Sequence, residues 1–195
     1  MTEIQGILLA AGSGQRFGRH KLLHPLPDGE SMGIASARNL VAALTNTLAV
    51  IRPGDQRLAA SLEALGLRVV ENSQAGQGMG RSLAMGVGAS ADAQGWVVAL
   101  ADMPWIKPET IGAVAQALSQ GARLAAPVYQ GRRGHPVGFG RRWGDRLQAL
   151  QGDHGARHLL QAHPDELVLL PTDDPGILLD IDHQDDLYPG EAPLD

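Results

Sequence analysis

Short apolar runs alternate with helix-like segments along almost the whole chain, and this order limits the possible folds more than any other feature of the sequence. A short apolar run that ends near a glycine, a proline or an acid is typical of a strand buried on both faces, as parallel strands are. We predict such strands at residues 6–11, 47–51, 67–71, 96–101, 123–128, 166–171 and 178–181.

Helical patterns occupy most of the intervals between these strands. We predict helices at residues 34–44, 56–65, 80–89, 108–120, 142–150 and 154–162. The clearest start is at Pro108, because proline is tolerated in a first helical turn and Glu109 lies near the positive helix end. The order indicates an α/β fold whose mainly parallel sheet has helices on both faces, and ligands of such sheets bind outside the carboxyl ends of the strands.

Length and composition exclude several classes of protein. A chain of 195 residues can be organised by one core, so we expect a single domain over 1–195, with a loose Pro/Gly/Asp-rich tail at 186–195. The net charge of −5 offers no positive field for a long nucleic acid. The chain has no cysteine, which excludes disulfides and thiol chemistry and fits a cytoplasmic protein. The first apolar run is too short for a signal peptide or a membrane span, so no membrane partner is expected.

The loop after the first predicted strand has the composition of a phosphate-binding site. Gly12, Gly14 and Gly18 let the backbone turn tightly and bring N–H groups near an anion, while Arg16 and Lys21 supply positive charge. The glycine spacing misses the dinucleotide G-x-G-x-x-G pattern by one residue, and the Gly-Lys-Ser/Thr of a Walker A loop is absent. The structural alternative is a glycine-rich turn with solvated basic residues.

Two acidic positions at predicted strand ends are candidates for metal binding. Asp102 follows an apolar strand, and a carboxylate there costs desolvation unless a hard cation such as Mg²⁺ neutralises it. The alternative role is a helix N-cap, but the helix is predicted to begin later, at Pro108. Asp180 and Asp182 lie on one side of the chain if their segment is extended. The alternative role for Asp180 and Asp182 is that of surface acids in an acidic tail, together with Asp173, Asp174, Asp185 and Asp186.

These segments resemble the signatures of the MobA-like nucleotidyltransferases. Residues 9–21 match L-A-A-G-x-x-x-R-x-G-x-x-K, residues 100–104 match L-A-D-M-P, and residues 176–182 are similar to the G-x-x-x-D-I-D ending. Residues 132–137 and 77–83 resemble the R-G-H-P and G-M-x-x-S-L stretches of the molybdenum cofactor cytidylyltransferases within that family. The resemblance implies a Rossmann-like three-layer α/β/α fold with a mainly parallel, mixed central sheet of the nucleotide-diphospho-sugar transferase type.

The resemblance also implies an activity and a set of site residues. The expected reaction is Mg²⁺-dependent transfer of CMP from CTP to the terminal phosphate of the molybdopterin cofactor, with release of pyrophosphate. Arg16, Lys21 and Asp102 would be catalytic, Asp102 and Asp182 would bind the metal, and the acceptor would contact Gly134, His135 and Pro136. The expected nucleotide-binding residues are Leu9, Ala10, Ala11, Gly12, Ser13, Gly14, Arg16, Lys21, Gly78, Arg81 and Ser82.

Several alternatives remain open at this point. Guanylyl relatives more often carry L-A-G-G, so Ala11 favours CTP over GTP, but a guanylyltransferase for the same cofactor is an alternative. Others are a cytidylyltransferase for a sugar or polyol phosphate and a non-enzymatic nucleotide-binding scaffold. A dinucleotide dehydrogenase is disfavoured because residues 47–52 lack the expected acid. A transient contact with a molybdoenzyme or its chaperone is a further partner expected from the resemblance.

Overall fold

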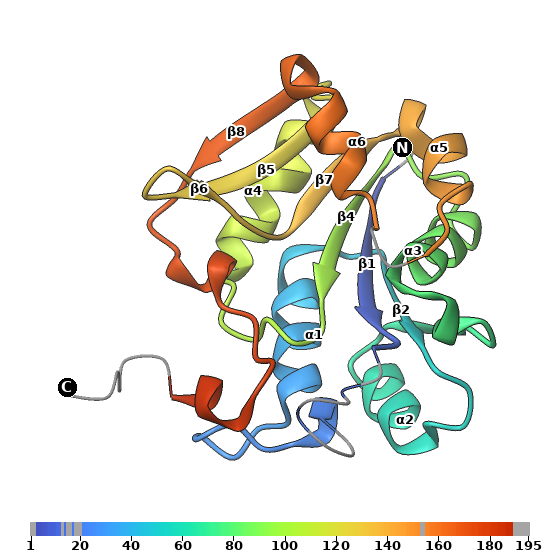
Figure 1. The fold of residues 1–195 in the computed structure, drawn as a ribbon, viewed down its shortest axis with the longest axis vertical. Coiled ribbons are helices and arrows are strands. Elements are labelled where there is room, and N and C mark those ends of the chain that lie inside the picture. The colour runs from blue at the N-terminus through green and yellow to red at the C-terminus, as the bar shows by residue number, and fades with distance from the viewer. Residues whose placement is uncertain (1–2, 13, 15–16, 18–20, 153–154, 189–195) are drawn as a thin grey trace.

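A mixed sheet forms the centre of the computed structural model, which describes residues 3–12, 14, 17, 21–152 and 155–188 (Figure 1). Within these ranges the sheet has eight strands in the order β3-β2-β1-β4-β7-β5-β6, with β8 pairing to β5. Strands β1 to β4 run parallel, β8 is parallel to β5, and β7 is antiparallel between β4 and β5. The strands are β1 (Ile4–Ala10), β2 (Thr47–Ile51), β3 (Arg68–Glu71), β4 (Gly95–Leu100), β5 (Leu124–Tyr129), β6 (Arg132–Arg133), β7 (Val137–Gly140) and β8 (Leu167–Pro171).

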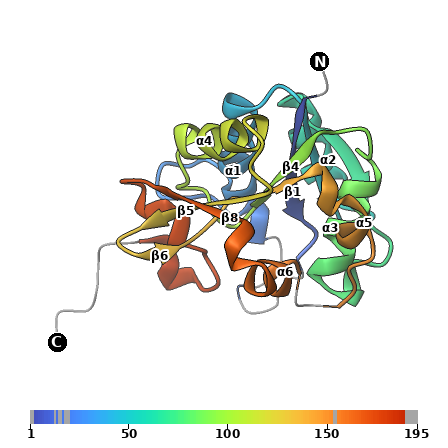
Figure 2. The same ribbon diagram turned by 90° about the horizontal axis from the view of Figure 1, so that it is seen from above.

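Helices cover both faces of this sheet, which confirms the predicted three-layer α/β architecture (Figure 2). The helices are α1 (Met32–Ala43), α2 (Gln56–Ala64), α3 (Met79–Gly88), α4 (Pro108–Ser119), α5 (Gly144–Gln148) and α6 (Arg157–Ala162). Helices α1, α2 and α4 contribute to one hydrophobic cluster, and α3, α5 and α6 contribute to another on the opposite face.

The central strands are buried on both sides because their apolar side chains alternate between the two clusters. In β1, Leu8 and Ala10 belong to the cluster of α1, whereas Ile7 and Leu9 belong to that of α3. These four side chains are at most 9% exposed. The uninterrupted apolar run in the sequence is therefore explained by a parallel strand that has no solvent face.

The C-terminal part of the chain corrects one predicted strand. Residues 178–181 do not form a strand, because a 3₁₀ turn covers Pro175–Leu178 and irregular backbone follows. Asp174 causes the turn by accepting a hydrogen bond from the Gly176 amide at 2.9 Å. The amide of Ile181 then donates to the Asp102 carbonyl at 3.0 Å, so the segment is joined to the end of β4 by this bond instead of a ladder.

Two strands and several 3₁₀ turns were not predicted from the sequence. Strands β6 and β7 lie in a glycine-rich stretch with no run of β-forming residues, and Gly138 faces Val114 of α4 too closely for a side chain. Residues 186 and 187 of the expected loose tail belong to a 3₁₀ turn over Gln184–Leu187, and residues 189–195 lie outside the described residues. Leu187 is only 5% exposed and packs in a small cluster with Phe17, Leu26, Met32, Ala35 and Ile181.

Asp174 anchors the segment after β8 to the start of α4. Its side chain is 1% exposed and accepts hydrogen bonds from the Lys107 amide at 2.8 Å and the Thr110 hydroxyl at 2.7 Å. The interpretation of Asp174 as a surface acid is therefore wrong. Both carboxylate oxygens of Asp174 accept hydrogen bonds, so its buried charge is stabilised. The backbone amides of Lys107 and Gly176 gain an acceptor at the same time.

The close approach of Gly176 to the chain at Trp105 leads to a stability prediction. A Cβ at Gly176 would lie 2.2 Å from the Trp105 carbonyl oxygen, so we expect Gly176→Ala to lower the free energy of unfolding by about 1–3 kcal/mol. Gly112→Ala is the matched control, because open space surrounds Gly112 inside α4 and alanine should raise stability by roughly 0.5–1 kcal/mol. Urea unfolding of both variants measures this difference, and equal midpoints would contradict the packing argument.

Candidate active site

Lys21 lies between two carboxylates at the carboxyl edge of the sheet. Its ammonium Nζ donates to Asp102 Oδ2 at 2.8 Å and to Asp182 Oδ1 at 3.4 Å. The lysine side chain is only 9% exposed, whereas those of Asp102 and Asp182 are 28% and 43% exposed. Three predicted site residues from distant parts of the sequence therefore meet at one point.

The fold places each of these side chains through backbone contacts. Asp102 follows β4, and the amide of Ala101 extends the pairing of β4 with β1 by donating to the Leu9 carbonyl at 3.1 Å. Ile181 is fully buried. Because Ile181 faces the interior, its neighbour Asp182 is directed to the site, where it meets Lys21.

Asp186 fixes the backbone on the other side of Asp182. One of its carboxylate oxygens accepts from the amides of Asp182 at 2.8 Å and His183 at 2.7 Å. The His183 amide is the main cause that lowers the pKa of Asp186, since it stabilises the charged carboxylate. Asp182 therefore lies between two constrained positions, Ile181 and the turn at His183.

The two carboxylates fit a divalent cation that binds together with a phosphate ligand. Among the described residues there is no group of three or more His, Cys, Asp or Glu side chains that could hold a metal ion. Mg²⁺ does not require such a cage, because it usually takes one or two protein carboxylates and completes its shell with waters and substrate phosphates. Asp102 and Asp182 match this donor set, and their contacts to Lys21 show that both face one cation position.

The predicted phosphate loop begins directly beside these residues. Leu9, Ala10 and Ala11 are buried, and Gly12 is exposed with open space at its Cβ position. Gly14 has a φ of +57°, and its carbonyl accepts from the Phe17 amide at 3.1 Å. Ser13 and Arg16 lie outside the described residues.

Arg52 is a loop contact that the sequence analysis missed. Its Nε donates to the Ala11 carbonyl at 2.7 Å and so holds the start of the phosphate loop. Arg52 follows β2, and β2 pairs directly with β1. The sequence signal that could have identified this contact is the position of Arg52 directly after β2, the parallel strand that neighbours β1.

The loop before α3 is held by its own polar side chains. Asn72 is fully buried and donates to the Ser82 hydroxyl at 3.0 Å, and Ser82 is 4% exposed. Arg81 donates to the Gln74 side chain at 2.6 Å, and Gly78 has a φ of +105° that favours glycine. Ser82 and Arg81 therefore stabilise the loop, together with Asn72, which the sequence did not mark as a site residue. Direct contacts of Gly78, Arg81 and Ser82 with a nucleotide stay predictions.

The predicted acceptor loop is attached to the segment that leads to Asp182. The Gly134 amide donates to the Pro127 carbonyl and the His135 amide donates to the Ile177 carbonyl, each at 3.0 Å, and the His135–Pro136 peptide is cis. A Cβ on Gly134 would lie 2.2 Å from the Ile177 carbonyl oxygen, so this contact needs glycine.

The His135 side chain is partly buried, and its Nδ1 has no hydrogen-bond partner within the described part of the chain. Burial lowers the pKa of His135, and the charges of Asp102 and Asp180 oppose that shift in part. The lowered pKa favours the neutral form of the imidazole, and His135 lies within the electrostatic reach of Asp102 and Asp180. Whether it contacts the acceptor stays a prediction.

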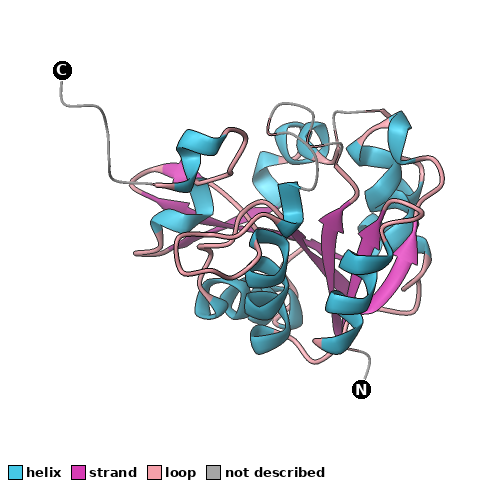
Figure 3. Cartoon of the chain, turned by 90° about the horizontal axis from the view of Figure 1, so that it is seen from below, coloured by secondary structure: helices cyan, strands magenta, loops and turns pink. Residues whose placement is uncertain are grey.

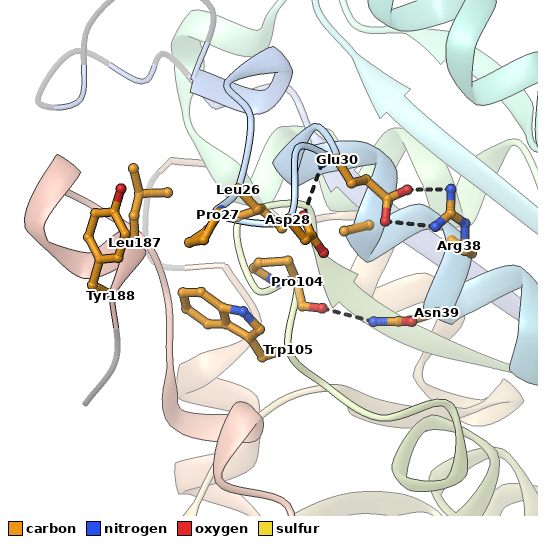
Figure 4. A pocket seen from close by; sticks show the side chains of 11 residues that line it. Leu26, Pro27, Asp28, Glu30, Arg38, Asn39, Pro104, Trp105, Leu187 and Tyr188 are labelled. Atoms are coloured by element: carbon orange, nitrogen blue, oxygen red, sulfur yellow. Dashed lines mark hydrogen bonds and ion pairs between the residues drawn. The ribbon is translucent and has the colours of Figure 1, made fainter. Parts of the chain in front are cut away.

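A separate cavity of about 580 Å³ lies near the site but does not contain it (Figure 4). Its walls include Trp105 and Tyr188, which follow the Asp102 segment and the last 3₁₀ turn. Several of its polar groups are engaged with one another: Glu30 pairs with Arg38, and Asn39 donates to the Pro104 carbonyl at 2.9 Å. Neither Lys21 nor the two carboxylates line this cavity. The candidate site is thus defined by converging charges and not by the shape of this cavity.

Comparison with known proteins identifies the family. A model of the MobA-like NTP transferase domain matches residues 6–167. The chain belongs to this family. It is 29% identical over 191 residues to the purine catabolism protein PucB of Bacillus subtilis, covering 91% of this chain and 90% of that protein. It is 28% identical over 194 residues to the nicotine blue oxidoreductase of Paenarthrobacter nicotinovorans, covering 95% of each.

Solved structures confirm the nucleotide-diphospho-sugar transferase type of fold. A nucleotidyl transferase from Methanothermobacter superposes with a TM-score of 0.80 at 24% identity and 94% coverage of both chains. Rv0371c of Mycobacterium tuberculosis, in complex with manganese, superposes with a TM-score of 0.77 at 24% identity, covering 95% of this chain and 96% of that one. The molybdopterin-guanine dinucleotide biosynthesis protein A of Archaeoglobus fulgidus gives 0.63 at 20% identity, with 94% of each chain covered.

None of the helices within the described ranges is both long enough and apolar enough to cross a bilayer (Figure 3).

The partly buried imidazole of His135 predicts a pH effect on stability. Because its pKa in the folded protein lies below the ordinary value of 6.5, the unfolded chain binds more protons than the folded protein as the pH falls. We therefore expect the free energy of unfolding to decrease from pH 7 to pH 5, and to decrease less steeply in His135→Gln. Urea unfolding across this pH range measures both slopes, and identical slopes would contradict the assignment.

Proposed function

We propose that this member of the family transfers CMP from CTP to the terminal phosphate of the molybdopterin cofactor in a reaction that uses Mg²⁺ and releases pyrophosphate. The observation that carries the proposal is the convergence of Lys21, Asp102 and Asp182 at the carboxyl edge of a nucleotidyltransferase sheet. An acceptor phosphate oxygen attacks the α-phosphorus of CTP. The bond between that phosphorus and the oxygen bridging to the β-phosphate breaks, and its electron pair leaves with pyrophosphate.

The chemistry makes demands that these residues meet. A phosphate monoester is already an anionic nucleophile near neutral pH, so the reaction needs alignment and charge neutralisation more than a protein nucleophile. Lys21, Arg16 and the amides of 12–14 would hold the phosphates. Asp102 and Asp182 would hold the divalent cation, which when bound stabilises negative charge on the phosphate oxygens. The manganese complex of Rv0371c supports the use of a divalent metal on this fold.

The choice of acceptor rests on the R-G-H-P segment. The His135 amide bonds to Ile177 and Gly134 packs against it, so this loop is attached to the segment that carries Asp182. An acceptor bound at Gly134, His135 and Pro136 would therefore lie near the carboxylates. The R-G-H-P segment resembles that of the molybdenum cofactor cytidylyltransferases, and this resemblance favours a pterin cofactor over a sugar or polyol phosphate. Delivery of the product to a molybdoenzyme or its chaperone would follow from this acceptor.

Pyrophosphate release with the purified protein tests the function. We expect release with CTP only when Mg²⁺ and molybdopterin cofactor are both present, and Asp102→Ala should abolish it. The fold should survive this change, because Asp102 holds Ile181 through its backbone carbonyl and not through its side chain. Asp185→Ala is the matched control, since Asp185 is exposed in the same acidic segment and should keep wild-type turnover. Full activity of Asp102→Ala at saturating Mg²⁺, or no release with any acceptor, would overturn the proposal.

The base preference gives a second prediction. Ala11 is 5% exposed at the end of β1, and its methyl group would exclude a purine from a tightly packed base edge while leaving room for a pyrimidine. Exclusion of this kind is worth about 1–3 kcal/mol, or roughly 10- to 200-fold in kcat/KM. We expect CTP to be preferred over GTP by that margin and Ala11→Gly to narrow it mainly by admitting GTP. Competition assays decide this, and equal use of both nucleotides by the wild-type protein would place base selection elsewhere.

A further inference from the structure

Lys21 occupies the space that a cation bound by Asp102 and Asp182 would need. Its Nζ lies 2.8 Å from one carboxylate and 3.4 Å from the other. A divalent cation on the same two oxygens would lie about 2.0–2.6 Å from each of them, which is the same region of space. An ammonium nitrogen and a metal ion cannot both fill it, because they repel each other and would overlap.

We propose that Lys21 and the divalent cation bind the two carboxylates in a mutually exclusive way. In the nucleotide-free protein Lys21 holds Asp102 and Asp182, and the cation displaces it toward the phosphates of an incoming nucleotide. The proposal rests on the proposed function for the metal-binding role of Asp102 and Asp182 and for the identity of that nucleotide.

The burial of Lys21 makes the exchange depend on a phosphate ligand. A side chain that is 9% exposed loses much of its hydration, so displacing its ammonium from both carboxylates without a new anionic partner is unfavourable. The nucleotide phosphates supply that partner. The cation should therefore bind weakly alone and much more tightly with nucleotide, and by thermodynamic reciprocity the nucleotide should bind more tightly with the cation.

The sequence offers a matched pair of variants for the test. Lys21 and Lys107 are the two lysines of the chain, and Lys107 is exposed, with its backbone amide bonded to Asp174. Mn²⁺ binding without nucleotide can be followed by the electron paramagnetic resonance signal of the free ion. We expect Lys21→Met to bind Mn²⁺ at least tenfold more tightly than the wild type, with Lys107→Met unchanged.

Two further variants separate displacement from a general charge effect. Lys21→Arg keeps the positive charge and should leave Mn²⁺ binding weak. Adding Asp102→Asn to Lys21→Met should remove the gain in affinity, because the gain depends on this carboxylate. A Lys21→Met affinity within twofold of the wild type, or a gain that persists without the Asp102 carboxylate, would overturn the proposal.

A measurement on the wild-type protein keeps the test decisive if Lys21→Met does not fold. Isotope-labelled lysine gives two side-chain NMR signals, which Lys107→Met assigns. Mg²⁺ and CTP together should shift the Lys21 signal strongly, and Mg²⁺ alone should shift it little. No shift with both ligands would overturn the proposal. The Mn²⁺ measurements need no turnover, so absence of pyrophosphate release alongside the predicted Mn²⁺ behaviour would contradict the proposed transfer reaction and not the exchange.

Discussion

One backbone hydrogen bond, from the Ile181 amide to the Asp102 carbonyl at 3.0 Å, determines the geometry of the candidate site. It joins the end of a central strand to a segment that reaches it from the far side of the sheet. The fully buried Ile181 side chain fixes the orientation of that segment, because turning it outward would expose a large apolar group. Asp182 is directed to Lys21 as a consequence, and the charge of Asp180 acts on His135.

The same C-terminal segment is held upstream by contacts that leave no room for larger residues. Asp174 bonds it to the start of α4, and Gly176 lies against the Trp105 carbonyl. Gly134 fits against Ile177 in the same manner, so the R-G-H-P loop and the metal-ligand candidates are parts of one packed unit. A rigid support of this kind is what a reaction that depends on alignment requires.

The electrostatic character of the site follows from where its charges are held. Two carboxylates flank one nearly buried lysine, whose charge offsets only one of theirs. The carboxylate pair therefore favours a divalent cation in place of the lysine, while the displaced lysine and the glycine-rich backbone of the first loop favour an anion. Such a site is suited to a metal–polyphosphate ligand, which brings both charges together. The aromatic-walled cavity beside Trp105 is lined by neither Lys21 nor the two carboxylates, and its own Glu30 and Arg38 are paired with each other.

Local sequence determined the alternating strands and helices, the start of α4 at Pro108 and the strand β2 with its observed bounds, because burial on two faces and helix periodicity leave direct marks in residue order. It also marked Lys21, Asp102 and Asp182 as site residues, since each belongs to a recognisable motif at a predicted strand end. Only the tertiary structure showed that β7 enters the sheet antiparallel, that residues 178–181 form no strand, and that Asp174, Arg52 and Asn72 hold loops together. These features depend on which backbone groups, distant in the sequence, still lack a hydrogen-bond partner in the folded chain. The neighbours of a residue in the sequence do not encode which distant group will become its partner.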